Sequence, residues 1–142
     1  MITISHLTKI FEGKGPRVTA LEDVNLEIGK GDIYGIIGMS GAGKSTLLRC
    51  LTLLERPTSG QIMLAGQDIA SLSGAQLRAA RRGMGVVFQG YNLLMQKTVA
   101  ENVAFPLRLE KGYDKAAVQA RVAELLAIVG LEDRAGAYPA QL

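Results

Sequence analysis

The stretch from residue 33 to residue 46 constrains this chain more than any other. An Ile-rich apolar run at 33–37 is typical of a buried strand, and a helical pattern begins with Leu47 and Leu48. Between them lies a short loop dense in glycine. Four loop residues match the pattern G-x-x-x-x-G-K-[ST] of a phosphate-binding loop: Gly38, Gly43, Lys44 and Ser45.

The residue types in this loop suit the chemistry of phosphate binding. Glycine lets the backbone curl tightly enough to point successive N–H groups at phosphate oxygens, and the helix N-terminus adds partial positive charge. Lys44 is expected to reach the β- and γ-phosphates, and Ser45 to offer its hydroxyl to Mg²⁺. The spacing therefore predicts a strand, a phosphate-binding loop and a helix in that order.

The composition indicates a folded chain. The expected lack of a signal peptide and of a membrane-spanning run predicts a location in the cytoplasm or on the cytoplasmic side of a membrane. Its 142 residues are 48% apolar and 20% charged, as in one globular domain or part of a larger one. No apolar run is long enough to span a bilayer, and residues 1–3 lead directly into strand-like sequence, so we expect no signal peptide.

Three other features have plain structural interpretations. The single cysteine, Cys50, lies among leucines of the helix after the loop and is expected to be a small core residue. The single histidine, His6, has no neighbouring ligands and is not expected to bind metal. Arg78, Arg81 and Arg82 could form a nucleic-acid patch, but without interleaved aromatic residues a solvated helix face is favoured.

The hydrophobic pattern predicts strands and helices in a mixed order. Strands are expected at 2–5, 9–11, 18–28 and 61–65, with a second buried strand at 84–89. Helices are expected from 43 to about 54, from 73 to 82, and from 98 until Pro106 kinks or ends the helix. Asp114 is expected to cap a longer helix that Gly130 closes.

Two further residues are candidates for ligand contacts. Phe11 could stack on a purine base, although an ordinary core phenylalanine is the commoner case. Gln89 ends the second buried strand, where its amide oxygen could meet Mg²⁺ or an attacking water. A glutamine at a strand end is more often a simple loop residue. The residues alone leave both alternatives open.

The motifs taken together resemble a known family, the ATP-binding subunits of ABC transporters. They occur in the family's order along the whole chain, from Gly38–Leu48 through Pro57–Gly60 and Val86–Gln89 to Thr98–Val103. Within that family the chain resembles the ATPase subunits of bacterial methionine importers most closely. The segments that carry this closer resemblance are Leu48–Cys50, Leu53–Gly60, Leu77–Arg82, Asn92–Leu94 and Tyr138–Leu142. Gly90 departs from the histidine expected there.

The resemblance implies an α/β fold with a P-loop NTPase core of the ABC ATPase type. An antiparallel β subdomain and the P-loop core are expected over residues 1–90, up to the family's Q-loop. The start of a helical subdomain is expected over 91–142. The core is expected to be incomplete, with apolar sheet surface left exposed and a tendency to aggregate.

The resemblance also assigns roles to the candidate site residues. Phe11 matches the aromatic residue that stacks on adenine, and Gln89 matches the glutamine that links the Mg²⁺–nucleotide site to the helical subdomain and the membrane partner. ATP and Mg²⁺ are the implied cofactors, with Ser45 and Gln89 as metal ligands. The residues expected to bind nucleotide are Phe11, Gly38, Met39, Ser40, Gly41, Ala42, Gly43, Lys44, Ser45, Thr46 and Gln89.

No catalytic residue is expected within these 142 residues. The family's Ser- and Gly-rich signature, its Walker B aspartate, its catalytic glutamate and its switch histidine have no counterparts here. Residues 125–133 and 62–68 resemble apolar strands ending in acids, but their patterns predict a helix end and a hairpin turn. The chain is therefore expected to be a nucleotide-binding fragment that does not hydrolyse ATP alone.

The implied whole protein is a peripheral ATPase on the cytoplasmic face of the cell membrane that drives amino-acid uptake. Its expected partners are a membrane-spanning permease, a second copy of the ATPase and, indirectly, a substrate-binding protein, with no nucleic acid. The alternative is an ABC-type ATPase of DNA repair or chromosome organisation. The short helix at 114–130 argues against that alternative, since such proteins are expected to carry inserted domains or coiled coil there.

Overall fold

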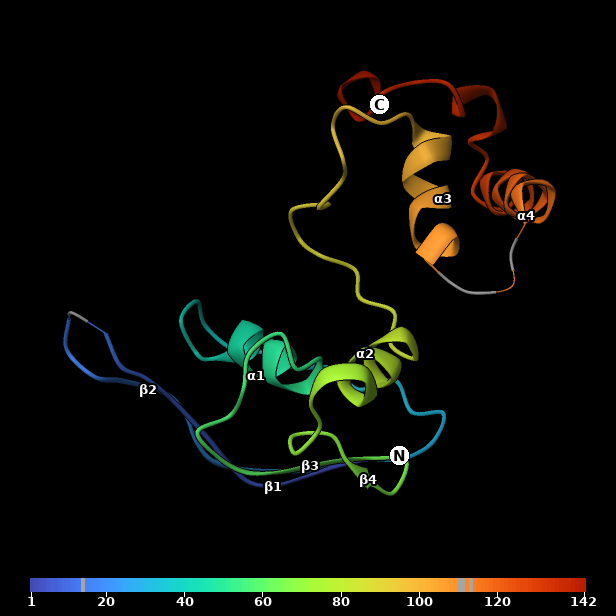
Figure 1. Cartoon of the computed structure of the whole chain (residues 1–142). Helices are drawn as coiled ribbons and strands as arrows, with labels where there is room; N and C mark the ends of the chain where they lie inside the picture. The colour runs from blue at the N-terminus through green and yellow to red at the C-terminus, as the bar shows by residue number, and fades with distance from the viewer. Residues whose placement is uncertain (14, 110–111, 113) are drawn as a thin grey trace. The chain divides into compact units, whose positions relative to one another are not determined.

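The computed structural model describes residues 1–13, 15–109, 112 and 114–142. The chain forms two compact units, Met1–Val86 and Val87–Leu142, each with its own core. The first unit contains a β-sheet with two helices, and the second is helical (Figure 1). The predicted domain boundary at residue 90 and the identity of the two parts stay predictions.

The sheet of the first unit is antiparallel. Its strands are β1 (Ile2–Phe11), β2 (Val18–Ile28), β3 (Ser59–Leu64) and β4 (Gln67–Asp68), in the order β2-β1-β3-β4. Ile4 lies opposite Leu26 on one side and Ile62 on the other. This register brings apolar side chains onto one face of the sheet, because alternate residues of a strand share a face. The antiparallel strands predicted from the sequence are confirmed.

The β1–β2 ladder is interrupted where His6 and Asp23 adopt left-handed backbone conformations, with φ of 51° and 48°. Side chains supply hydrogen bonds at this irregularity. The His6 N–H donates to Asn25 Oδ1 at 2.8 Å, and the Asp23 N–H donates to Thr8 Oγ1 at 3.1 Å. His6 Nδ1 also lies 2.7 Å from Asp23 Oδ1. The only histidine is therefore part of the sheet's own polar network.

Two helices, α1 (Lys44–Leu51) and α2 (Gly74–Arg82), pack on the apolar face of the sheet (Figure 1). Cys50 of α1 is fully buried in the core that α1 shares with the sheet, as the sequence predicts, and burial raises the pKa of its thiol. The buried core consists of Ile4, Leu7, Leu21, Leu47, Cys50, Leu53, Ile62, Ile69 and Leu72.

The interpretation of the α2 arginines as a solvated face is wrong for one of them. Arg81 is half-buried, and its guanidinium donates to the backbone carbonyl of Leu53, just after α1. Arg78 and Arg82 are exposed. A cation near the C-terminal end of a helix is favoured by the helix dipole, which explains the position of Arg81.

The second unit is built on two packed helices, α3 (Val99–Leu109) and α4 (Lys115–Ile128), followed by the 3₁₀ turns η1 (Glu132–Arg134) and η2 (Pro139–Gln141). Asp114 caps α4 as predicted, since its Oδ1 accepts from the Ala117 N–H at 2.7 Å. α3 does not end at Pro106 but continues to Leu109. One lost backbone hydrogen bond is offset there by packing, because Val99 and Ala104 of α3 share a core with Val118, Val122 and Leu126 of α4.

The predicted burial of the two Ile- and Val-rich strands is wrong. Residues 33–38 and 84–88 form no paired strand, and Ile33, Ile37 and Val87 are almost wholly exposed. A parallel core strand needs neighbours on both edges to bury its side chains. Within the described residues, the four strands of the sheet pair only with one another. The exposed apolar residues here lie outside the sheet, so the predicted exposure of apolar sheet surface stays a prediction.

The described helices include none that is both long and apolar enough to cross a membrane.

α3 begins with the reciprocal cap that the sequence predicts. The Glu101 N–H donates to Thr98 Oγ1 at 3.2 Å, and the Thr98 N–H donates to Glu101 Oε2 at 2.9 Å. The second bond, with the nearby Lys97 ammonium, lowers the pKa of the Glu101 carboxyl below its ordinary value. The ionised form of Glu101 is therefore the one that holds the start of α3.

Acid should loosen the start of α3. Because the pKa of Glu101 is lowered in the fold, its contribution is present above the ordinary pKa of 4.5 and is lost as the pH falls through the lowered value. We expect the Thr98 amide to lose protection against hydrogen exchange once the pH is below the lowered pKa of Glu101. In Glu101→Gln the side chain accepts the same bond without ionising, so protection should not depend on pH. An identical acid response in the variant would assign the effect to another group.

Candidate functional site

The phosphate-binding loop is shaped by glycines in the left-handed region of backbone space. Gly38, Gly41 and Gly43 have φ of 152°, 82° and 86°. Ala42, between the last two, is not left-handed, and its N–H donates to the Met39 carbonyl at 3.2 Å. Alternation of left- and right-handed residues turns successive backbone N–H groups toward one concave side, which is an anion-binding arrangement.

α1 begins directly at the end of this loop and leaves its first N–H groups available. Gly43 is the N-cap residue and provides no side-chain cap, and the first helical hydrogen bond runs from the Leu47 N–H to the Gly43 carbonyl at 2.8 Å. No acidic side chain lies in the first turn. The positive end of the helix is thus directed at the concave side of the loop without a carboxylate to neutralise it.

Lys44 closes the loop on itself. Its Nζ donates to the carbonyl oxygens of Gly38 and Met39, both at 2.7 Å. These two bonds hold the ammonium above the loop and use two of its three N–H donors. The third N–H and the full positive charge are available to an anion that enters the loop.

The loop is fixed to the sheet by a close backbone contact. A Cβ atom on Gly43 would lie 2.5 Å from the Ala20 carbonyl oxygen and 3.1 Å from Leu21 Cδ2. No side chain fits in that space, so α1 approaches β2 as closely as two backbones allow. This contact sets the start of the helix against the antiparallel sheet.

Phe11 lies at the same end of the sheet as the loop. It is the last residue of β1 and pairs with Val18, two residues from the Ala20 carbonyl that touches the loop. The residue is 39% exposed, so the alternative of an ordinary core phenylalanine is wrong. An exposed aromatic ring near a phosphate loop is a suitable platform for a base.

Gln89 belongs to the second unit and is exposed in a turn with Gly90. Its proposed contribution to the loop stays a prediction. Gly90 does not have a positive φ, and a Cβ at this position would meet nothing within 4 Å. The departure from the expected histidine is therefore not forced by local geometry.

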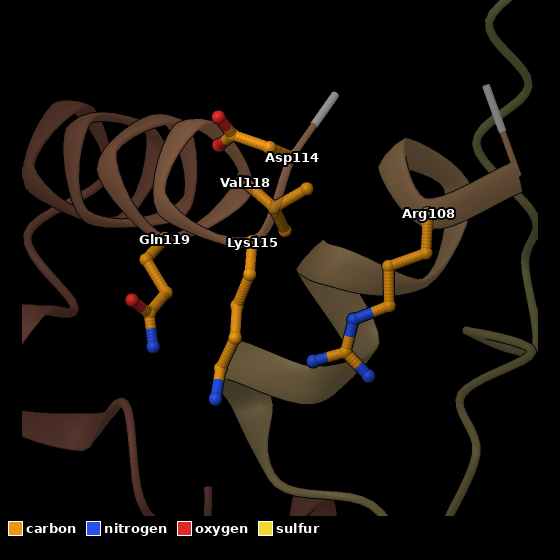
Figure 2. Close-up of a pocket in the computed structure, with 5 residues that line it drawn as sticks. All are labelled: Arg108, Asp114, Lys115, Val118 and Gln119. Carbon is orange, nitrogen blue, oxygen red and sulfur yellow. The ribbon is translucent and has the colours of Figure 1, made fainter. Parts of the chain in front are cut away.

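The second unit contains a hollow of about 360 Å³ between α3 and α4, lined by Arg108, Asp114, Lys115, Val118 and Gln119 (Figure 2). It includes none of the predicted nucleotide-binding residues. Asp114 already serves as the cap of α4. We therefore take the loop at 38–46, and not this hollow, as the candidate functional site.

The structure also adds a residue that sequence reasoning missed. Lys9 Nζ lies 4.8 Å from the centre of the Phe11 ring. The available signal was the spacing Lys-x-Phe in a predicted strand, which places both side chains on one face. The pattern of a strand alone does not predict contact between a lysine and the aromatic residue two positions later. The structure is what shows the contact between Lys9 and Phe11.

The sequence comparisons agree on one family. Residues 21–142 match the family described as ABC transporter. The chain is 53% identical to the methionine import ATP-binding protein MetN of Desulfitobacterium hafniense and 54% identical to that of Symbiobacterium thermophilum. Both alignments cover all of this chain and 42% of the relative. The chain thus spans less than half the length of the curated relatives it matches.

The structural comparisons show the same fold. The chain superimposes with a TM-score of 0.91 on the ATP-binding cassette MJ0796, solved as a dimer in a post-hydrolysis state with ADP and Pi. The two are 34% identical, and the match covers all of this chain and 63% of that one. A second dimeric structure of MJ0796, described as a bacterial ABC transporter cassette, matches equally well. The predicted fold class is confirmed.

The contact between loop and sheet can be tested by adding one methyl group. Gly43→Ala should destabilise the first unit by more than Gly66→Ala, measured as the free energy of unfolding in urea. The two glycines have nearly equal φ, 86° and 85°, so each variant carries the left-handed cost of roughly 1–2 kcal/mol.

Of these two glycines, Gly43 has a backbone oxygen in the way of the new atom, whereas a Cβ at Gly66 meets nothing within 4 Å. The difference between the two variants therefore reports the contact with Ala20. Equal losses would mean that the loop can move away from β2 at no cost.

Proposed function

This chain belongs to the ABC transporter family, and from that premise we propose that it binds ATP as the nucleotide-binding part of an ABC importer ATPase. The observation that carries the proposal is the loop at 38–46, where left-handed glycines, an uncapped helix start and the Lys44 ammonium surround one concave backbone surface. A triphosphate suits this surface, because all three features attract negative charge.

We assign the two ends of the nucleotide to two parts of the first unit. The loop and the first turn of α1 are proposed to bind the phosphates, through Lys44 and the backbone N–H groups. Phe11 is proposed to stack on adenine. Its exposed ring and its position at the loop end of the sheet support this assignment. Such stacking contributes about 1–3 kcal/mol per base.

We propose Mg²⁺ as the accompanying metal, with Ser45 and Gln89 among its ligands. Ser45 is exposed at the second position of α1, and a serine hydroxyl and an amide oxygen are hard oxygen donors of the kind Mg²⁺ takes. When bound, the ion would neutralise charge on the β- and γ-phosphates.

For the whole protein we propose methionine uptake driven by ATP hydrolysis. The support is the printed function of the relatives, methionine import, and the dimeric state of the similar cassette. We propose a peripheral location on the cytoplasmic face of the membrane, with a permease, a second ATPase copy and, indirectly, a substrate-binding protein as partners. Residues 1–90 and 91–142 are proposed as its β-subdomain with P-loop core and the start of its helical subdomain.

We propose that these 142 residues bind ATP without hydrolysing it. The family's Walker B aspartate, catalytic glutamate and switch histidine have no counterparts in the sequence. A general base and a metal-holding carboxylate are what the attacking water requires. Purified chain should release no phosphate above background, and turnover that Lys44→Ala abolishes would contradict this proposal.

Removing the loop lysine should abolish tight ATP binding. Lys44→Ala deletes the ammonium held at the loop and its two bonds to Gly38 and Met39, so we expect affinity for Mg·ATP to fall at least about 100-fold. Titration calorimetry measures the effect. Lys30→Ala removes one exposed positive charge in a turn outside the site and is the matched control. Equal losses in both variants would mean that net charge, and not the loop, attracts the nucleotide.

A further inference from the structure

Lys9 is held unusually firmly for a lysine. Its side chain is only 12% exposed, and its Nζ lies 2.6 Å from Glu55 Oε1 and donates to the Arg56 carbonyl at 2.8 Å. The Glu55 N–H in turn donates to the Arg49 carbonyl at 3.0 Å, near the end of α1. The ammonium is therefore tied to the segment that follows the phosphate-loop helix.

The same ammonium sits over an aromatic face. Lys9 Nζ is 4.8 Å from the centre of the Phe11 ring, within the range in which a cation is attracted by the ring's negative face. Lys9 covers one face of the ring, and Phe11 nevertheless remains 39% exposed. Part of the ring is open to a flat partner.

We propose that Lys9 is a positioning residue for the nucleotide base. It links one face of Phe11 to the segment that follows α1, so that the free part of the ring presents a fixed platform to adenine at a set distance from the loop. The cation also draws π-electron density toward itself, which makes the ring a better partner for an electron-rich purine. This proposal rests on the proposed function, since it requires a base on Phe11.

A purely structural role for Lys9 makes a different prediction. If Lys9 only joins β1 to the end of α1, its loss would affect every ligand of the loop alike, through general loosening of the unit. If Lys9 positions the base, its loss affects ligands that carry a base and leaves a bare phosphate chain alone. The ratio of two affinities separates the two roles.

The test compares Mg·ATP with magnesium tripolyphosphate, which lacks base and sugar, on the purified chain by calorimetry. Lys9→Met should weaken ATP about three- to tenfold and change tripolyphosphate affinity by less than about twofold. Lys9→Arg, which keeps both the cation and the ion pair, should restore the ATP affinity. In a Phe11→Ala background, Lys9→Met should have no further effect on ATP, because the platform is gone.

Lys9→Gln is a second variant for the case in which Lys9→Met does not fold. Lys9→Met leaves Glu55 without its ammonium, whereas glutamine can still donate a hydrogen bond but offers the ring no charge. Lys9→Gln should lower the ratio of ATP affinity to tripolyphosphate affinity, as Lys9→Met does. Equal weakening of both ligands in either variant, or an undiminished Lys9 effect without the Phe11 ring, would overturn the role of Lys9.

Failure of the proposed nucleotide binding gives results that differ from failure of the Lys9 role. If the wild-type chain binds neither ligand, the proposal that the loop binds phosphates is wrong. The proposed role of Lys9 is then wrong too. Wild-type chain that binds both ligands equally well would contradict base stacking on Phe11 and therefore also the platform. Wild-type chain that prefers ATP while the Lys9 variants keep that preference would overturn only the positioning role.

Discussion

The contact between Gly43 and the Ala20 carbonyl is the constraint on which the candidate site depends. It brings the N-terminus of α1 against β2 with no side chain between them. Through β2 the loop is then fixed relative to β1, whose last residue is Phe11. Two parts of one proposed nucleotide site, contributed by residues about thirty positions apart, are thereby held on one sheet and the helix packed against it.

Much of the fold could be predicted where the signals are local. The Gly-Lys-Ser loop, the alternating strands of the antiparallel sheet and the caps at Thr98 and Asp114 each depend on residues close in sequence. The structure bears out the strands in their register and the two caps in their hydrogen bonds, and phosphate binding by the loop stays a prediction. The core position of Cys50 followed for the same reason, since helical spacing alone places it among leucines.

The wrong predictions share a cause, because each concerns a feature that depends on residues distant in the sequence. The runs at 33–37 and 84–89 have strand composition, but a strand is buried only when other strands flank it, and composition does not supply them. Arg81 and Lys9 were likewise misjudged or missed because their partners, the Leu53 carbonyl and Glu55, come from another element. Pro106 was expected to kink or end α3, and of these two the ending is wrong, since packing against α4 accompanies a helix that continues past it.

The proposed nucleotide site requires that phosphates bind the loop while the base lies on Phe11. Amide hydrogen exchange of the purified chain, with and without Mg·ATP, tests it most directly because it reports every segment at once. With Mg·ATP bound, exchange should slow at residues 38–46 and at the end of β1 around Phe11, with little change elsewhere in the first unit. Unchanged exchange in the loop, or protection confined to the hollow between α3 and α4, would contradict it.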